Sequence, residues 1–113
     1  LYDGAYDIPC QFRYFECLPG GYSTLEYHEH THMVMIGRGK GQLLLGDEIY
    51  DVKKGDFIEI PGNTIHQFRA NKGDYIGFFC LVNKERDKVK LLSDEEMETL
   101  RNHPKIKAFL ESC

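Results

Sequence analysis

Apolar and polar residues alternate in short runs between positions 11 and 82, and glycine, proline, asparagine or aspartate separates one run from the next. β-branched and aromatic residues are common within the runs, which is typical of strands in a half-buried sheet. Strands are predicted at residues 12–17, 22–28, 33–38, 42–45, 49–52, 57–60, 66–70 and 75–82. The glycine-rich residues 37–41 read as a turn between two of these strands. Because the connections are too short for parallel crossovers, we expect antiparallel pairing in an all-β barrel or sandwich.

The turn at residues 71–74, Asn-Lys-Gly-Asp, predicts a hairpin between the strands on either side of it. In a symmetric hairpin, Phe68 lies opposite Phe78 and His66 lies opposite Cys80. Phe78 and Cys80 are therefore expected walls of any pocket that forms near His66.

Residues 93–113 change to a helical pattern. Ser93 followed by Glu96 fits a capping box, which predicts a helix at residues 94–102. Pro104 suits the first position of a second short helix, whose apolar face is formed by Ile106, Phe109 and Leu110.

Length and composition describe one ordinary globular domain of 113 residues, with 42% hydrophobic residues and 28% charged residues. We expect a β-barrel over residues 1–92 and a helical tail over residues 93–113 that packs on the barrel or on a second subunit. The net charge of −4 comes with scattered lysines and arginines, so nucleic acid is not an expected partner.

No apolar run approaches the ~20 residues that cross a bilayer, and no signal peptide is evident, so a cytoplasmic location without membrane contact is expected. The four cysteines, at positions 10, 17, 80 and 113, lack metal-finger spacing and read as reduced thiols.

Histidines gather at one place in the sequence. His28, His30 and His32 fall within five residues, between predicted strands. Further along, Gly55, Pro61 and His66 form a G-x5-P-x4-H pattern, in which a glycine turn, a strand and a proline turn lead to a histidine that opens the next strand.

These two stretches resemble the two sequence motifs of the cupin superfamily, with residues 21–41 as the first and residues 55–66 as the second. The resemblance implies a small double-stranded β-helix, or jelly-roll barrel, with one or two short C-terminal helices. It also implies one divalent transition-metal ion inside the barrel (Mn, Fe, Zn, Ni or Co), a small-molecule ligand beside it, and a homodimer built by strand exchange or sheet contacts. Residues 2–15 are a candidate for the exchanged strand.

The resemblance also implies a ligand set, with an exchange of residue types. Counting back from Gly39 places the usual glutamate position of the first motif at His32 and its two usual histidine positions at Glu26 and His28; the second-motif histidine is His66. Three imidazoles and one carboxylate remain, a set that suits the metals named above.

Two other interpretations stay open. If His28 and His30 form the histidine pair instead, Val34 or Met35 takes the glutamate position and a three-histidine site results. The second open interpretation is a metal-free barrel, in which ordinary hydrogen bonds satisfy the histidines.

The expected activity follows from the ion: a metal-dependent dioxygenase or an isomerase-like enzyme. A non-catalytic module that senses a small molecule or a metal, and a metal-free structural cupin, are the alternatives. Glu59 and Tyr27 are the available acid or base groups outside the ligand set. We expect metal affinity to fall below about pH 6, where imidazoles hold protons.

Overall fold

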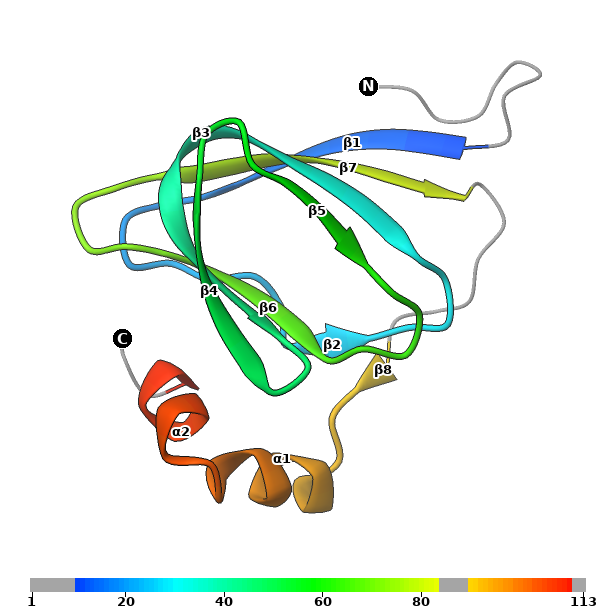
Figure 1. Ribbon diagram of the computed structural model, residues 1–113, viewed down its shortest axis with the longest axis vertical. Coiled ribbons are helices and arrows are strands. Elements are labelled where there is room, and N and C mark those ends of the chain that lie inside the picture. The colour runs from blue at the N-terminus through cyan, green and yellow to red at the C-terminus, as the bar shows by residue number, and fades with distance from the viewer. Residues whose placement is uncertain (1–9, 84–89, 111–113) are drawn as a thin grey trace.

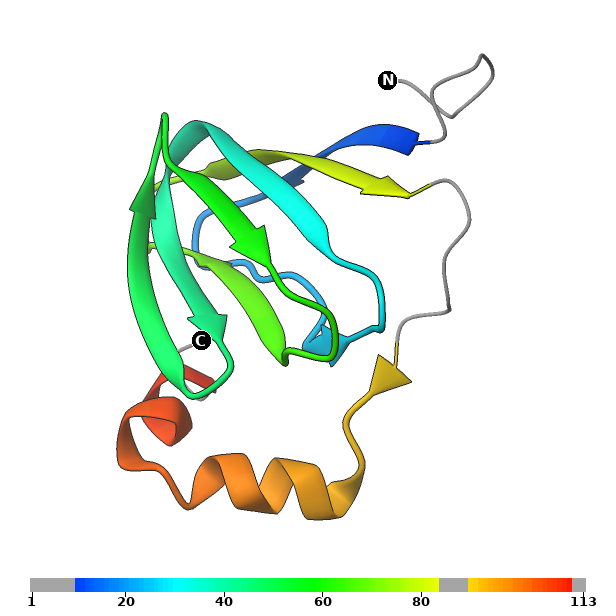
Figure 2. The ribbon, with the colours of Figure 1, turned by 45° about the vertical axis from the view of Figure 1, so that its right-hand side comes forward.

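The computed structural model describes residues 10–83 and 90–110. Within them, eight strands curl into two antiparallel sheets that enclose a core, and two helices lie outside the second sheet (Figures 1 and 2). The first sheet contains β1 (Cys10–Cys17), β7 (Ile76–Asn83), the first part of β3 (His32–Leu45) and β5 (Phe57–Ile60). The second contains the remainder of β3 with β4 (Glu48–Lys53), β6 (His66–Ala70), β2 (Glu26–Tyr27) and β8 (Lys90–Leu91). The jelly-roll fold class expected from the sequence is confirmed.

One long strand, β3, belongs to both sheets. The predicted turn at residues 37–41 is wrong, because the chain continues there as a bent strand with a register shift between Ile36 and Arg38. Gly39 adopts a φ of 73°, and a Cβ atom at this position would overlap the carbonyl oxygen of Tyr75. The glycines therefore serve to bend the strand around the barrel rather than to reverse it.

The hairpin predicted at residues 71–74 is also wrong. β6 pairs with β2 and β3, whereas β7 pairs with β1 and β3, so this connection carries the chain from one sheet to the other. Phe68 and Phe78 still face each other, with stacked rings whose centroids lie 4.3 Å apart, but they do so across the barrel interior. His66 is not opposite Cys80 in a sheet.

The strand predicted at residues 22–28 is much shorter in the structure. Only Glu26–Tyr27 forms β2, and Tyr22 makes an isolated bridge to Arg69. Between them, Ser23 holds the segment to β6, because its hydroxyl oxygen accepts from the backbone N–H of Phe68 at 2.9 Å.

The barrel core lies between the two sheets. It is formed by buried side chains from both of them: Val34, Ile36, Leu43, Val52, Ile60, Phe68, Ala70, Ile76, Phe78, Cys80 and Val82. Alternation along each strand directs these residues inward and leaves the intervening ones outside.

The C-terminal helices cover the outer face of the second sheet. The capping box at Ser93 is confirmed, and α1 spans Asp94–Arg101. α2 (Pro104–Leu110) begins at the expected proline. Their buried residues Leu100, Ile106 and Phe109 surround Leu44, which is fully buried on the outward side of β3. No helix among the described residues is both long and apolar enough to cross a membrane.

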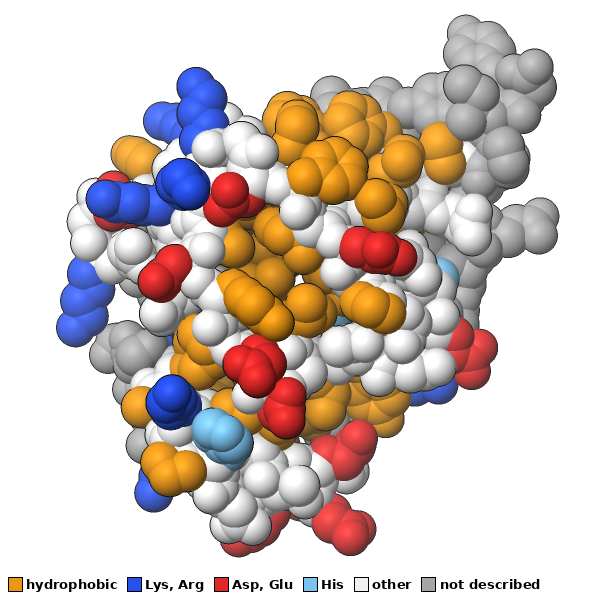
Figure 3. Space-filling model, in the orientation of Figure 1, with side chains coloured by type: hydrophobic (Ala, Val, Ile, Leu, Met, Phe, Trp, Pro, Cys, Tyr) orange, Lys and Arg blue, Asp and Glu red, His pale blue; other side chains and the backbone are white. Residues whose placement is uncertain are grey.

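The outer face of the first sheet is apolar but uncovered by any described element. Figure 3 shows hydrophobic side chains gathered over this part of the molecule. We call this surface the outer apolar face; it consists of Phe12, Tyr14, Met33, Met35, Phe57, Phe79 and Leu81. Phe57 is the most exposed of its large hydrophobic residues, at 65%.

Candidate metal centre

Pairing between β2 and β6 brings two of the expected ligands together. Glu26 is the register partner of His66, so their side chains share one face of the second sheet. Glu26 Oε1 lies 3.9 Å from His66 Nε2. The other ring nitrogen of His66, Nδ1, lies 2.9 Å from the carbonyl oxygen of Thr64. Because a carbonyl only accepts, Nδ1 carries the proton and Nε2 of the neutral ring holds the lone pair.

The same arrangement recurs at His28, which follows directly after β2. Its Nδ1 lies 2.8 Å from the carbonyl oxygen of His30, so this nitrogen also donates and again leaves the lone pair on Nε2. The turn after β5 fixes the backbone here: Asn63 N donates to the carbonyl oxygen of His28 at 2.6 Å. A side chain at Gly62 would overlap the carbonyl oxygen of Glu29. Gly62, which directly follows the motif proline Pro61, therefore lets the two motif segments touch.

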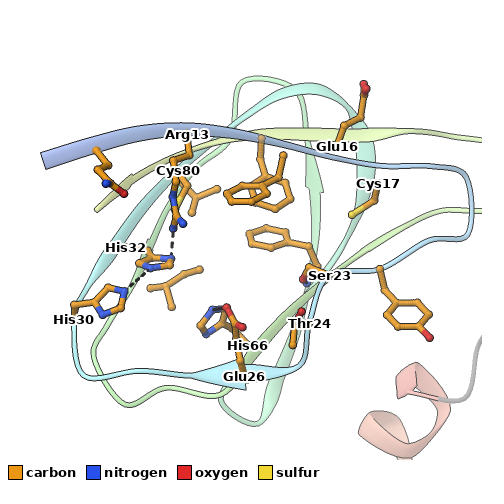
Figure 4. Close-up of a pocket in the computed structure, with 17 residues that line it drawn as sticks. Arg13, Glu16, Cys17, Ser23, Thr24, Glu26, His30, His32, His66 and Cys80 are labelled. Carbon is orange, nitrogen blue, oxygen red and sulfur yellow. Dashed lines mark hydrogen bonds and ion pairs between the residues drawn. The ribbon is translucent and has the colours of Figure 1, made fainter. Parts of the chain in front are cut away.

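His32 opens β3 from the opposite side of the cluster. Its Nδ1 lies 3.3 Å from the sulfur of Cys80, and its Nε2 lies 2.8 Å from Nε2 of His30 (Figure 4). Cys80 sits in β7 and pairs with Val34, two residues after His32 in β3. Cys80, like Cys10 and Cys17, is a free thiol. The expected proximity of Cys80 to the site is therefore real, but it arises from β3 rather than from a hairpin with β6.

Three buried histidines form the centre of this cluster. His28, His32 and His66 each offer one ring nitrogen, and these atoms all lie within 4.8 Å of one another, so the three residues can hold a metal ion. His30 and His32 both stack on the ring of His28, each with centroids 4.0 Å from it. His30 is less buried and stands at the edge of the group.

Burial keeps two of these rings neutral. Desolvation lowers the pKa of His32 to about 2, with further lowering by the nearby His28, His30, His66 and Arg13. Desolvation also lowers the pKa of His66 to about 4, although its bond to Thr64 opposes the shift. Both rings are therefore deprotonated well below neutral pH, which is the state that binds a metal. Burial raises the pKa of Glu26, an effect that the charges of Arg13 and His30 oppose.

A cavity of about 990 Å³ lies beside the histidines. This volume is near the upper end of the range of roughly 300–1,000 Å³ that small-molecule sites occupy. Glu26, His30, His32, His66 and Cys80 line it, whereas His28 is not among its lining residues. Apolar walls include Phe78, as the sequence led us to expect.

Arg13 also lines the cavity, although no sequence motif marks it. Of the two groups nominated from the sequence as acid or base, Glu59 is exposed, and Tyr27 directs its hydroxyl to Glu96 at 3.4 Å. Neither lines the cavity.

Comparison with protein families gives a match to the cupin domain over residues 13–82. One relative, from Rhodospirillum rubrum, is 45% identical over 101 residues and is named 1-methylthio-D-xylulose 5-phosphate methylsulfurylase. The match covers 89% of this chain but only 65% of that protein, so the chain spans slightly less than two thirds of its length.

Solved structures give the same family. A cupin 2 conserved barrel domain protein from Rhodopseudomonas palustris is 50% identical, with a TM-score of 0.89 over 91% of this chain and 71% of that one. A cupin-2 domain from Rhodospirillum rubrum is 42% identical, with a TM-score of 0.93 over 98% of this chain and 74% of that one. Because the cupin-domain match spans more than half of the chain and these relatives share its barrel, the protein belongs to the cupin family.

Proposed function

We propose that this cupin holds one divalent transition-metal ion on His28, His32 and His66, with Glu26 as the fourth ligand. The observation that carries the proposal is the meeting of three buried imidazoles, with their ring nitrogens within 4.8 Å of one another, beside a large cavity. Three imidazole nitrogens and a carboxylate oxygen suit Mn, Fe, Co, Ni or Zn. When bound, such an ion supplies a Lewis acid that polarises a ligand oxygen.

The hydrogen bonds around the cluster support this assignment. The carbonyl oxygens of Thr64 and His30 hold the Nδ1 protons of His66 and His28, so each ring is oriented before any ion binds. Such supports are typical of metal-binding histidines. Glu26 contributes a negative charge next to His66, and its half-buried position favours pairing with a cation.

We further propose that the cavity takes a small phosphorylated sugar. The relative from Rhodospirillum rubrum supports this, since its name describes a methylthio-substituted xylulose phosphate and the identity extends over 89% of this chain. A keto sugar of that kind has neighbouring carbonyl and hydroxyl oxygens that a divalent ion can bind. In an enzyme acting on such a substrate, His30 is placed to move a proton, because it lines the cavity and lies outside the proposed ligand set.

A non-catalytic binding module is the second candidate function. It is favoured by the positions of Glu59 and Tyr27, which leave the cavity with few acid or base groups apart from the proposed ligands. Such a protein would use the same ion and the same cavity to bind a sugar phosphate without converting it.

Elemental analysis of untagged protein purified without chelator tests the metal centre. We expect close to one ion per wild-type chain and a loss of most of it in His66→Ala. His103→Ala is the matched control, because this histidine is exposed in the helical tail. An absence of metal from the wild type, even after divalent ions are supplied, would refute the metal proposal.

Turnover separates the two candidate functions. The metal-loaded wild type and His30→Ala are incubated with 1-methylthio-D-xylulose 5-phosphate, with and without a small thiol as acceptor, and its consumption is followed by proton NMR, which also detects an isomer of equal mass. Consumption by the wild type and not by His30→Ala supports the enzyme. Binding without consumption, measured by calorimetry on the same samples, assigns the binding module instead.

We also propose that two copies of the chain associate through the outer apolar face. Its aromatic rings are in contact, with the ring centroids of Phe12 and Phe79 5.4 Å apart and those of Tyr14 and Phe79 5.0 Å apart. Contiguous exposed apolar surfaces often mark an interface. Within the described residues β1 pairs with β7 of its own chain, and the rest of the candidate exchanged strand, residues 2–9, lies outside them. Light scattering of wild type and Phe57→Glu tests this: we expect a dimer that the variant converts to a monomer. A monomeric wild type would contradict the proposal.

A further inference from the structure

Arg13 occupies an unusual position for an arginine, on the inner face of the barrel. It lies in β1 opposite Cys80 of β7, which in turn pairs with Val34 of β3. Because register partners share a face of the sheet, these three side chains form one row, and all three line the cavity. Figure 4 shows Arg13 extending from β1 into the barrel toward His32.

Within residues 10–83 and 90–110, Arg13 has no acidic partner. The ion pairs in this part of the chain join Arg38 to Glu16, Lys53 to Asp56, Lys90 to Glu29 and His66 to Glu26. The Nε atom of Arg13 is buried and makes no hydrogen bond, and the contact that the guanidinium makes is with the ring of Phe15, 5.1 Å away.

Arg69, which is buried, provides a contrast. Arg69 donates to Gln67 Oε1 at 3.2 Å and to the carbonyl oxygen of Leu110 at 2.8 Å, and its guanidinium also lies over the rings of Tyr22 and Phe109. Arg69 is thus bound into the fold, where it ties β6 to α2. Arg13 has no comparable structural task. The carboxylate of Glu26 lines the same cavity, but within the described residues it forms its ion pair with His66 and not with Arg13, and a cation without a direct partner is unfavourable there.

A bound anion can act as the direct partner that the described residues do not provide. The guanidinium presents a planar fork of N–H donors that matches the oxygens of a phosphate or carboxylate. An anionic group at Arg13 would lie in the row next to His32, so the rest of the molecule would extend toward the histidine cluster. We propose that Arg13 is the anchor for an oxyanion, specifically the phosphate group of the sugar phosphate that binds in the barrel. This inference rests on the proposed function for the choice of phosphate, but not for the presence of an anion site.

Calorimetry with a pair of sugars that differ only in the phosphate tests the anchor. D-xylulose 5-phosphate, D-xylulose, D-xylonate and inorganic phosphate are titrated into metal-supplemented wild type, Arg13→Gln, Arg13→Lys and Arg38→Gln. Arg38 is the matched control because it is an exposed arginine outside the cavity, paired with Glu16 at 2.9 Å. We expect Arg13→Gln to weaken D-xylulose 5-phosphate at least tenfold, Arg13→Lys to weaken it less, and Arg38→Gln to leave it unchanged.

The remaining arms decide what any other result means. Equal affinity of wild type and Arg13→Gln for D-xylulose 5-phosphate would overturn the proposal, as would wild-type protein that binds neither phosphate compound nor D-xylonate. Arg13-dependent binding of D-xylonate alone would overturn the choice of phosphate. The melting temperature provides a second readout, since inorganic phosphate should raise it for the wild type and not for Arg13→Gln.

Metal content separates this inference from the proposed function. If the wild type holds no ion but binds phosphate through Arg13, the metal proposal fails and the anchor stands. If Arg13→Gln retains its metal and loses phosphate affinity, both proposals are supported.

Discussion

The Nε2 atoms of His30 and His32 lie 2.8 Å apart, close enough for one proton to be shared between the two rings. One ring must donate and the other accept. An ion that takes the lone pair of His32 removes this hydrogen bond, so His30 must then either bind the ion beside His32 or turn toward the cavity. The second response fits the ligand set that includes Glu26 and His32. In the three-histidine set that the sequence left open, His28, His30 and His66 bind the ion and His32 does not.

Single substitutions distinguish the two sets. With Glu26 as the fourth ligand, Glu26→Ala should weaken metal binding at least tenfold, because it removes a residue that binds the ion directly. His30→Ala should change metal binding by less than about threefold, because His30 does not bind the ion in this set. Competition with a fluorescent chelator measures both values. A large loss in His30→Ala combined with none in Glu26→Ala would assign the site to His30 instead.

The thiol of Cys80 should tune the site through His32. When an ion occupies Nε2 of His32, the protonated Nδ1 faces the sulfur of Cys80, 3.3 Å away. Removing such a support typically costs roughly ten- to a hundredfold in metal affinity, and about tenfold is expected for Cys80→Ala because sulfur is a weak acceptor. Cys17→Ala is the control, since Cys17 also lines the cavity. Unchanged affinity in Cys80→Ala would show that the contact does not orient His32.

The sequence allowed the barrel and most of the cluster to be predicted, because both depend on local patterns. Alternation marks strands directly, and the spacing around Gly39 and His66 placed three histidines in one group that the structure brings within 4.8 Å. The predictions from the sequence were wrong where one local pattern is compatible with two different structures. Glycines at residues 37–41 permit either a turn or a bend, and only the pairing of β3 with both sheets selects the bend.

Arg13 could not be recognised from sequence for a similar reason. Its neighbours in sequence, Phe12 and Tyr14, lie on the opposite face of β1, while Phe15 and Cys17 lie on the same face as Arg13. Both faces of this strand are therefore apolar, and alternation does not reveal which one lines the interior. The register of β1 with β7 settles the question, since it aligns Arg13 with the buried Cys80.

Metal-free protein should lose stability as the pH falls from 7 to 5. The pKa values of His32 and His66, about 2 and about 4, lie below that of an unfolded histidine, so the unfolded chain takes up protons that the folded state refuses. The cost at pH 5 is about 2 kcal/mol for each ring. The raised pKa of Glu26 opposes this loss, because the folded state keeps that proton to higher pH than the unfolded chain. Urea denaturation at the two pH values measures the difference.

Two variants serve as comparisons for that experiment. His66→Gln should show a smaller pH dependence than the wild type, by about 2 kcal/mol, because one titrating ring is gone. His103→Gln should leave the pH dependence unchanged, since His103 is exposed. Equal stability of the wild type at pH 7 and pH 5 would mean that these rings are not desolvated as the structure indicates.

The same pKa values move the pH at which metal is lost. Unperturbed histidines would release an ion below about pH 6. Rings that stay neutral down to about pH 4 take up few protons above that pH, so protons compete little with the ion for them. Protonation of His32 and His66 should therefore change the metal affinity of the folded protein by less than about twofold between pH 7 and pH 5. Chelator competition across this range measures it, and a steep loss centred near pH 6 would contradict the burial argument.

Substitution of Leu44 tests whether the helical tail unfolds together with the barrel. This fully buried side chain faces outward from β3 and packs under Leu100, Ile106 and Phe109, so it joins the barrel to both helices. Leu44→Ala should lower the free energy of unfolding by about 2–5 kcal/mol, the range for truncating a buried leucine. Urea denaturation followed by circular dichroism should show helix and sheet lost in one transition in the wild type and in Leu44→Ala. Leu91→Ala is the control, because Leu91 is 67% exposed and its truncation should change the free energy of unfolding little. An early loss of helical signal in Leu44→Ala alone would mean instead that the barrel folds without its tail and that the helices are held mainly by this one contact.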